Sequence, residues 1–104
     1  MILYSVTVSV DTDIAADWLE WMQQTHIPEV MDTGYFSAYT MQELLDPPPQ
    51  TGTLTFNVQY QCASRAQYEA YLQTAAPALQ QDHAARFREK ALAFRTLLRQ
   101  IDRG

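Results

Sequence analysis

The chain has 104 residues, of which 47% are hydrophobic and only three are glycine. This is the length of a single domain, and the composition excludes a disordered chain. Seven Lys and Arg against twelve Asp and Glu give a formal net charge of −5. From the chain's length we expect one domain over residues 1–104. Because such an acidic chain repels phosphate backbones and anionic membranes, we expect no nucleic-acid or membrane partner.

The start of the chain and its cysteine content predict a cellular location. No signal peptide precedes Ile2-Leu3-Tyr4, and no apolar run approaches the roughly 18 residues of a membrane span. The single cysteine, Cys62, cannot form an internal disulfide, which is typical of a reducing compartment. These features predict a cytoplasmic protein.

The first half of the chain predicts a strand, a helix and a second strand. Apolar and polar residues alternate over residues 2–10, as in a strand with one buried face. Asp11-Thr12-Asp13 supplies capping groups for a helix that should run to His26 and break there, since Pro28 disfavours helical backbone at Ile27. A further turn over residues 28–32 should end at Gly34, and residues 36–45 read as a strand.

The second half predicts a strand, a helical segment and a last strand. The prolines of residues 46–52 require a loop, and the clearest alternation in the chain follows over residues 53–62. Ser64 and Gln67 form a capping box that opens a helix, and Pro77 can begin a further helix. Residues 91–101 alternate again and form the last predicted strand.

This order predicts an α+β fold of ferredoxin-like β-α-β-β-α-β type. Right-handed crossovers place the helices on one face of a four-stranded antiparallel sheet. We expect the opposite, open face to be polar, so that any dimer formed through it would have a wet interface. The residues assigned to that face are Ser5, Thr7, Ser9, Thr55, Asn57, Gln59, Gln61, Arg95 and Arg99.

Two histidines are the candidate catalytic residues. His26 ends the first predicted helix on the stripe of Trp18 and Met22, and its near-neutral pKa suits a general base or a ligand contact. It could equally cap the helix and bond a nearby carbonyl. His83 lies between apolar residues on the last helix, where a satisfied core histidine is the alternative to a ligand contact.

Other side chains can be assigned to a pocket or to the core. Trp18, Met22 and Tyr68 can line an apolar cleft with the histidines, or can simply belong to the core. Arg95 and Arg99 can bind an anion or pair with a residue such as Glu43. We expect no metal site, because zinc needs three or four ligands, and we expect Cys62 to be an inert buried residue.

Four segments resemble a bacterial family of unknown function. They are the residue ranges 1–8, 18–30 (Trp-Leu-Glu-Trp-Met-Gln-Gln-Thr-His-Ile-Pro-Glu-Val), 76–83 and 93–98. That family is similar in turn to the dimeric α/β-barrel superfamily, which includes cofactor-independent monooxygenases, haem-degrading enzymes and lactone isomerases. The resemblance implies two subunits with their sheets packed together and a ligand between the sheet and the helices of each.

The sequence departs from the haem-degrading members of that superfamily. Those members use an asparagine on the first strand and a tryptophan ten residues before a histidine. Here the first strand has no asparagine, and Gln73 stands ten residues before His83. Haem degradation is therefore disfavoured.

Two functional hypotheses remain open. The first is a homodimer that binds a small apolar or aromatic molecule. Such a protein could be a simple binding domain, or an enzyme that resembles monooxygenases or isomerases and holds no cofactor tightly. Its site would contain Trp18, Met22, His26, Tyr68 and His83. The second is a non-catalytic dimerisation or interaction module with structural histidines. The residues by themselves do not establish a reaction.

Overall fold

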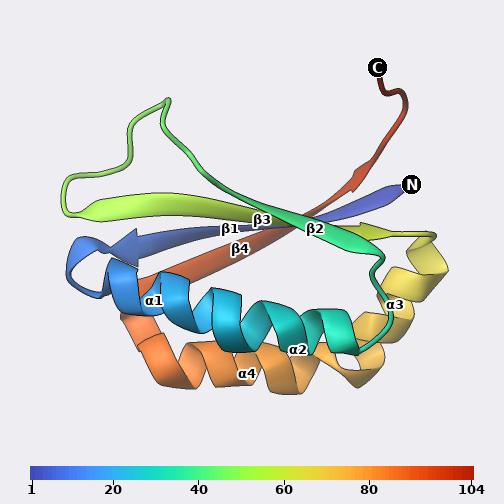
Figure 1. The fold of residues 1–104 in the computed structure, drawn as a ribbon, viewed down its shortest axis with the longest axis horizontal. Coiled ribbons are helices and arrows are strands. Elements are labelled where there is room, and N and C mark those ends of the chain that lie inside the picture. Colours follow the sequence, from blue (N-terminus) through green and yellow to red (C-terminus); the bar gives the residue numbers. More distant parts are fainter.

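The computed structural model describes residues 1–104, and it places a layer of helices against one face of a sheet (Figure 1). The helical layer contains α1, a π-helical segment η2, α2, α3 and α4. The elements are β1 (Ile2–Asp11), η1 (Thr12–Ile14), α1 (Ala15–Trp21), η2 (Met22–His26), α2 (Ile27–Asp32), β2 (Ala38–Glu43), β3 (Thr53–Cys62), α3 (Arg65–Thr74), α4 (Ala76–Phe87), η3 (Arg88–Lys90) and β4 (Ala91–Arg99).

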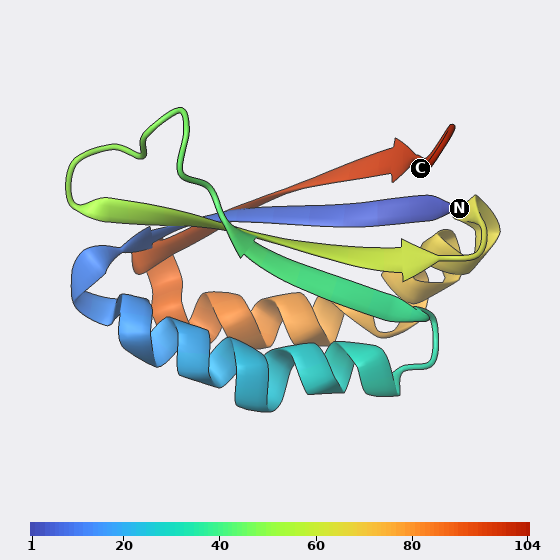
Figure 2. The same cartoon turned by 45° about the horizontal axis from the view of Figure 1, so that its top comes forward.

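The sheet confirms the predicted ferredoxin-like fold. Its strand order is β2-β3-β1-β4, and each neighbouring pair is antiparallel. The two long crossovers place α1, α2 and α4 under the same face (Figure 2). None of the helices is long and apolar enough to cross a membrane.

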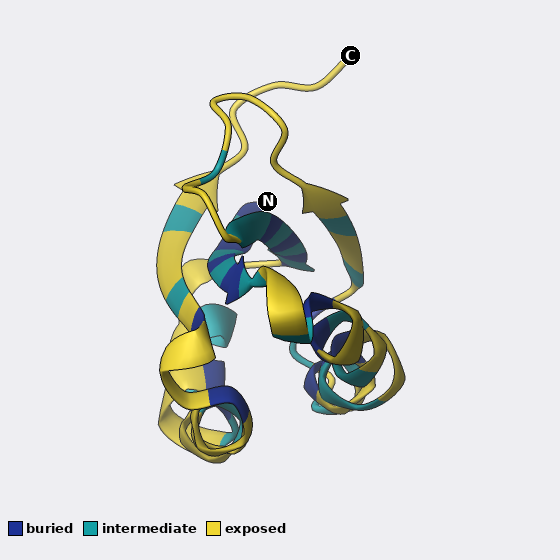
Figure 3. Cartoon of the chain, turned by 90° about the vertical axis from the view of Figure 1, so that its left-hand side faces the viewer, coloured by how far each residue is buried: buried dark blue, intermediate teal, exposed yellow.

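The core lies between this helical layer and the sheet (Figure 3). The alternation of β1 and β3 predicts their inward side chains correctly, since Val10 and Val58 are fully buried. Trp18 of α1 is also fully buried against them. Cys62 is buried as predicted, and its thiol donates to the carbonyl of Ser64 at 3.3 Å.

The predicted helix break at His26 is wrong. The backbone remains helical through η2 into α2, but the Ile27 N–H bonds the carbonyl of Met22, five residues back. Pro28 has no N–H and its ring would collide with the carbonyl four residues earlier. The wider π turn relieves that conflict, so the helix continues to Asp32. It is followed by Gly34 with φ +83°, the predicted left-handed cap.

The helical segments after β3 begin where the sequence predicts. The Ser64 hydroxyl accepts a hydrogen bond from the Gln67 N–H at 3.2 Å and caps α3. Pro77 lies in the first turn of α4, where its missing N–H has no cost. β2 and β4 are each shorter than predicted, ending at Glu43 and Arg99.

The assignment of Arg95 and Arg99 to the open face is also wrong. β4 pairs with β1 so that Arg95 stands opposite Val6 and Arg99 opposite Ile2, and both of these β1 residues face the helices. Three large apolar residues of β4 are turned to the open face instead. There Leu92, Phe94 and Leu98 are 61%, 62% and 43% exposed.

The rest of the open face is polar, as predicted. Asn57 of β3 joins three strands there. Its amide accepts from Gln42 at 2.7 Å and donates to the hydroxyls of Ser5 at 2.9 Å and Thr7 at 3.1 Å. The open face therefore combines a hydrogen-bonded polar centre with an apolar stripe along β4.

Candidate functional site

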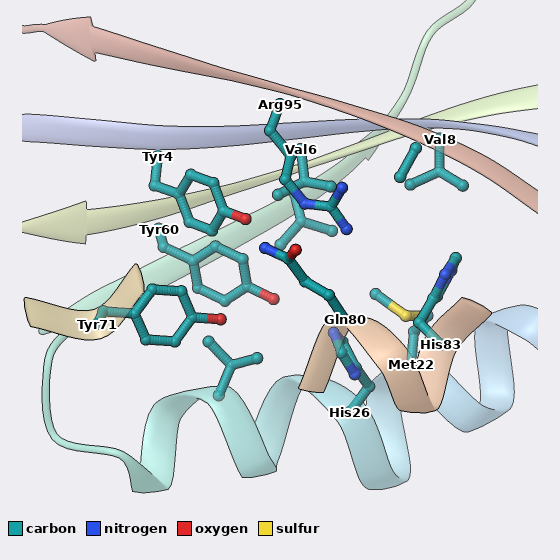
Figure 4. A pocket seen from close by; sticks show the side chains of 13 residues that line it. Tyr4, Val6, Val8, Met22, His26, Tyr60, Tyr71, Gln80, His83 and Arg95 are labelled. Atoms are coloured by element: carbon teal, nitrogen blue, oxygen red, sulfur yellow. The ribbon is translucent and has the colours of Figure 1, made fainter. Parts of the chain in front are cut away.

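A small cavity lies between the helical layer and the sheet, and both histidines line it (Figure 4). Its volume of about 20 Å³ leaves room for roughly one water molecule. Its lining residues are Tyr4, Val6, Val8, Met22, His26, Val30, Val58, Tyr60, Tyr71, Gln80, His83, Ala93 and Arg95.

His83 reaches the cavity from α4 and is held by a tryptophan. The indole N–H of Trp18 donates to Nε2 of His83 at 3.0 Å, across the interior. His83 is 6% exposed, so this bond satisfies two buried groups at once. Because Nε2 accepts, a neutral His83 ring carries its proton on Nδ1.

His26 reaches the same cavity from the end of η2. Its ring stacks on Trp21 with the centroids 5.0 Å apart, and the His83 ring lies 6.0 Å away. The Nδ1 atom of His26 is buried and has no hydrogen-bond partner. The expected role of His26 as a helix cap is therefore not what the structure shows, since the helix continues beyond it.

Both imidazoles are neutral near pH 7. Burial, together with the positive charge of Arg95, lowers the pKa of His83 to about 4. Burial likewise lowers the pKa of His26 to about 4, helped by His83 and Arg95 and opposed by Asp82. The near-neutral pKa expected for His26 is therefore not found. The neutral rings can accept or donate hydrogen bonds, and a pKa near 4 makes them weak bases at pH 7.

Three tyrosines form the other end of the cavity. The rings of Tyr4 and Tyr60 lie 5.8 Å apart, and Tyr71 lies 5.9 Å from Tyr4. Burial raises the pKa of all three phenols. They remain protonated near neutral pH and present hydroxyl groups toward the middle of the cavity (Figure 4).

Arg95 and Gln80 complete the cavity, and sequence reasoning missed both as neighbours of the histidines. In Figure 4 the Arg95 guanidinium extends from β4 toward the Gln80 amide, between the tyrosine and histidine ends. The alternation of β4 could not reveal this, because both of its faces carry apolar residues. Only the pairing of Arg95 with Val6 shows which face it occupies.

The structure brings together three of the five predicted ligand residues. Met22, His26 and His83 line the cavity. Trp18 lies behind His83 and contacts the cavity only through it. Tyr68 of α3 packs against Tyr4, with the centroids 5.1 Å apart, and does not line the cavity.

A larger hollow adjoins the cavity. This α4–β4 groove has a volume of about 390 Å³ and shares four lining residues with the cavity: Gln80, His83, Ala93 and Arg95. A separate groove of about 590 Å³ lies at Trp21 and Arg86 and shares no residue with the cavity. No three His, Cys, Asp or Glu side chains gather in a metal-binding arrangement.

Comparison with known proteins identifies the family. Residues 1–101 match the family described as "Domain of unknown function (DUF4286)", and the chain belongs to that family. No functionally curated protein matches the sequence.

Solved structures show the fold in several bacterial and environmental proteins. HapK from Hahella chejuensis has a TM-score of 0.72 at 15% identity, with 100% of this chain and 96% of HapK covered. A Deinococcus radiodurans protein provisionally assigned as an antibiotic biosynthesis monooxygenase has a TM-score of 0.70 at 18% identity, with 99% of this chain and 95% of that protein covered. A dimeric ferredoxin-like protein from an uncultured marine organism has a TM-score of 0.62 at 14% identity, with 99% of this chain and 98% of that protein covered. At these identities the likeness concerns the fold.

Proposed function

We propose that this chain is a homodimeric domain that binds a small apolar or aromatic molecule between its helical layer and its sheet. The observation that carries the proposal is the convergence of His26 and His83, both neutral, on one cavity with a buried His26 Nδ1 that has no partner. An unpaired buried polar atom is costly, and such atoms are found where a ligand or water completes the site.

The same groups suit proton transfer. A neutral imidazole can take a proton from a bound substrate, and the tyrosine hydroxyls can stabilise the charge that develops. The fold neighbour provisionally assigned as a monooxygenase makes oxygenation one reaction to test, and isomerisation needs only the proton transfer. Neither reaction in this form calls on a tightly held cofactor.

The proposed dimer uses the open face of the sheet. Leu92, Phe94 and Leu98 are exposed in the single chain, and exposed apolar side chains that share one face favour an interface. A fold neighbour is described as dimeric. The interface would be apolar along β4 and wet around Asn57, whereas the sequence had suggested a wholly wet one.

We also propose a cytoplasmic location and no nucleic-acid partner. A free buried cysteine suits a reducing compartment, and the net charge of −5 disfavours a phosphate backbone.

A second candidate function is a non-catalytic dimerisation module. The Trp18–His83 hydrogen bond and the cavity volume of about 20 Å³ favour it, because both are compatible with a purely structural His83. In that case the imidazoles would serve the packing and would contact no ligand.

An NMR titration with indole, a neutral aromatic probe, separates the two functions. The first predicts saturable shifts of the His26 and His83 ring signals. Shifts confined to the open face, or none at millimolar indole, would leave only the module. Sedimentation equilibrium tests the dimer independently, and a species of 11.9 kDa at micromolar concentration would exclude it.

A further inference from the structure

Arg95 is a cation on the face of the sheet where apolar side chains are expected. Its cross-strand partner is Val6, and its guanidinium acts on the pKa of His26, His83 and Tyr4. The chain has two ion pairs, Arg65–Glu69 and Lys90–Asp13, and neither includes Arg95. Within the chain, the alternative pairing with Glu43 is also absent. Arg95 is exposed and has no carboxylate partner in the chain, so a ligand that enters the groove can reach its charge.

The α4–β4 groove concentrates this positive charge. Its lining includes Arg88 and Arg95 but no Asp or Glu, although acidic residues outnumber basic ones in the chain as a whole. Arg88 has φ +53°, a conformation that side chains other than glycine rarely adopt. Such strain persists where the surrounding structure requires it, and it is concentrated at binding sites.

A second hydrogen-bond donor lies at the junction of cavity and groove. The Trp18 hydrogen bond leaves Nδ1–H of His83 as a donor with no partner in the chain. The amide of Gln80 and the hydroxyl of Tyr4 lie beside the Arg95 guanidinium in Figure 4, where their oxygens can accept from it. The guanidinium and the imidazole N–H are donors, and together they match the acceptor oxygens of a carboxylate.

Apart from Gln81, the remaining walls of the groove are apolar. Ala84, Ala91 and Ala93 line it, and its volume of about 390 Å³ falls in the range of small-molecule sites. A ring or short aliphatic chain can lie against these alanines while a charged group reaches Arg95. The cavity itself is too small for this, so the ligand must lie mainly in the groove.

We propose that the ligand is a small aromatic or aliphatic carboxylic acid, held by Arg95 where the cavity meets the α4–β4 groove. This inference rests on the proposed function and names its ligand class. The carboxylate accepts from the guanidinium and from Nδ1–H of His83, and the apolar part lies along the alanines of α4 and β4. The negative charge of the carboxylate thereby compensates the positive charge of Arg95.

Benzoate and benzamide form a matched pair of probes, because they share a ring and differ in charge. We expect benzoate to bind at least roughly tenfold more tightly than benzamide, measured by NMR shifts of His83, Ala84 and Ala93. Arg95→Gln should abolish this difference, and Arg95→Lys should retain part of it. Arg99→Gln is the control, since Arg99 lies on the same strand face but lines neither hollow.

The outcomes separate the two proposals. Equal binding of benzoate and benzamide at the groove would overturn the acid as ligand and leave the binding domain intact. The same holds if benzoate binds Arg95→Gln as tightly as the wild type. If neither benzoate, benzamide nor indole shifts these signals at millimolar concentration, both proposals fail.

Discussion

The two faces of the sheet differ in an unexpected way along β4. The helix-covered face is apolar on β1 and β3 but carries two cations on β4, Arg95 and Arg99, and neither has a carboxylate partner. The open face is polar around Asn57 except along β4, where it exposes Leu92, Phe94 and Leu98. On each face, β4 therefore carries side chains of the opposite polarity to those of the other strands.

These exceptions lie where binding is proposed. Strands and helices that only need to fold are locally consistent, and departures concentrate at functional positions. On the covered face the departure marks the proposed ligand site, and on the open face it marks the proposed dimer interface. The comparison therefore predicts that substitutions on the two faces affect different properties.

The largest expected effect is on the covered face. His83→Ala removes the acceptor of the Trp18 N–H and leaves a void, so the free energy of unfolding should fall by about 3 kcal/mol. Urea unfolding measures the change. His83→Gln keeps an acceptor and should lose less, and Trp18→Phe should cost less in the His83→Ala background than in the wild type, because the hydrogen bond is already absent. A loss below about 1 kcal/mol for His83→Ala would contradict a structural role of this bond.

A drop in pH should destabilise the same face. The pKa of each imidazole falls from 6.5 in the unfolded chain to about 4 in the folded protein. Between these values the unfolded chain binds protons that the folded chain does not, so the free energy of unfolding decreases as pH falls through this window. Since His26 is partly exposed, its share should be on the order of 1 to 2 kcal/mol.

The share of His26 can be isolated by comparing unfolding curves of wild type and His26→Gln between pH 7 and pH 4. His26 makes no hydrogen bond within the chain, so this variant leaves the Trp18–His83 bond intact. Parallel curves would show that His26 is not held neutral in the folded protein.

A charge on the open face should act on assembly and not on the cavity. Phe94→Asp places a carboxylate in the proposed interface, and the dimer should dissociate roughly tenfold more readily, a change of about 1.4 kcal/mol. Sedimentation at several concentrations measures it, with Phe94→Leu as the apolar control. If Phe94→Asp dimerises like the wild type, the interface lies elsewhere.

The smallest expected effect concerns Arg88. Arg88→Gly relieves the strain at φ +53°, and we expect a net gain in stability of about 1 kcal/mol, because the added flexibility of the unfolded chain offsets part of the relief. The same change should weaken benzoate binding by removing a cation from the groove. Thermal unfolding measures the gain in stability, and the NMR titration measures the loss of benzoate binding. A loss of stability would show that the Arg88 side chain contributes more than its backbone costs.

The sequence predicted most of the fold because its signals are local. The alternation in β1 and β3, the Ser64 cap and the Pro77 helix start each depend on a few adjacent residues. The break at His26 was predicted from an equally local rule for Pro28, and it failed because a π turn offers the helix another way past proline. The histidines were identified as candidates from their type alone, and their convergence required the fold.

The sequence by itself determined that a β-α-β-β-α-β domain forms and that β1 and β3 have one dry face each. Only the tertiary structure decided which face of β4 turns inward, because that strand carries apolar residues on both faces and its alternation does not choose between them. A slip of one residue would exchange Arg95 for Phe94 beneath α4. Hydrogen bonding to β1 sets that register, and with it the cation in the proposed site and the apolar stripe on the open face.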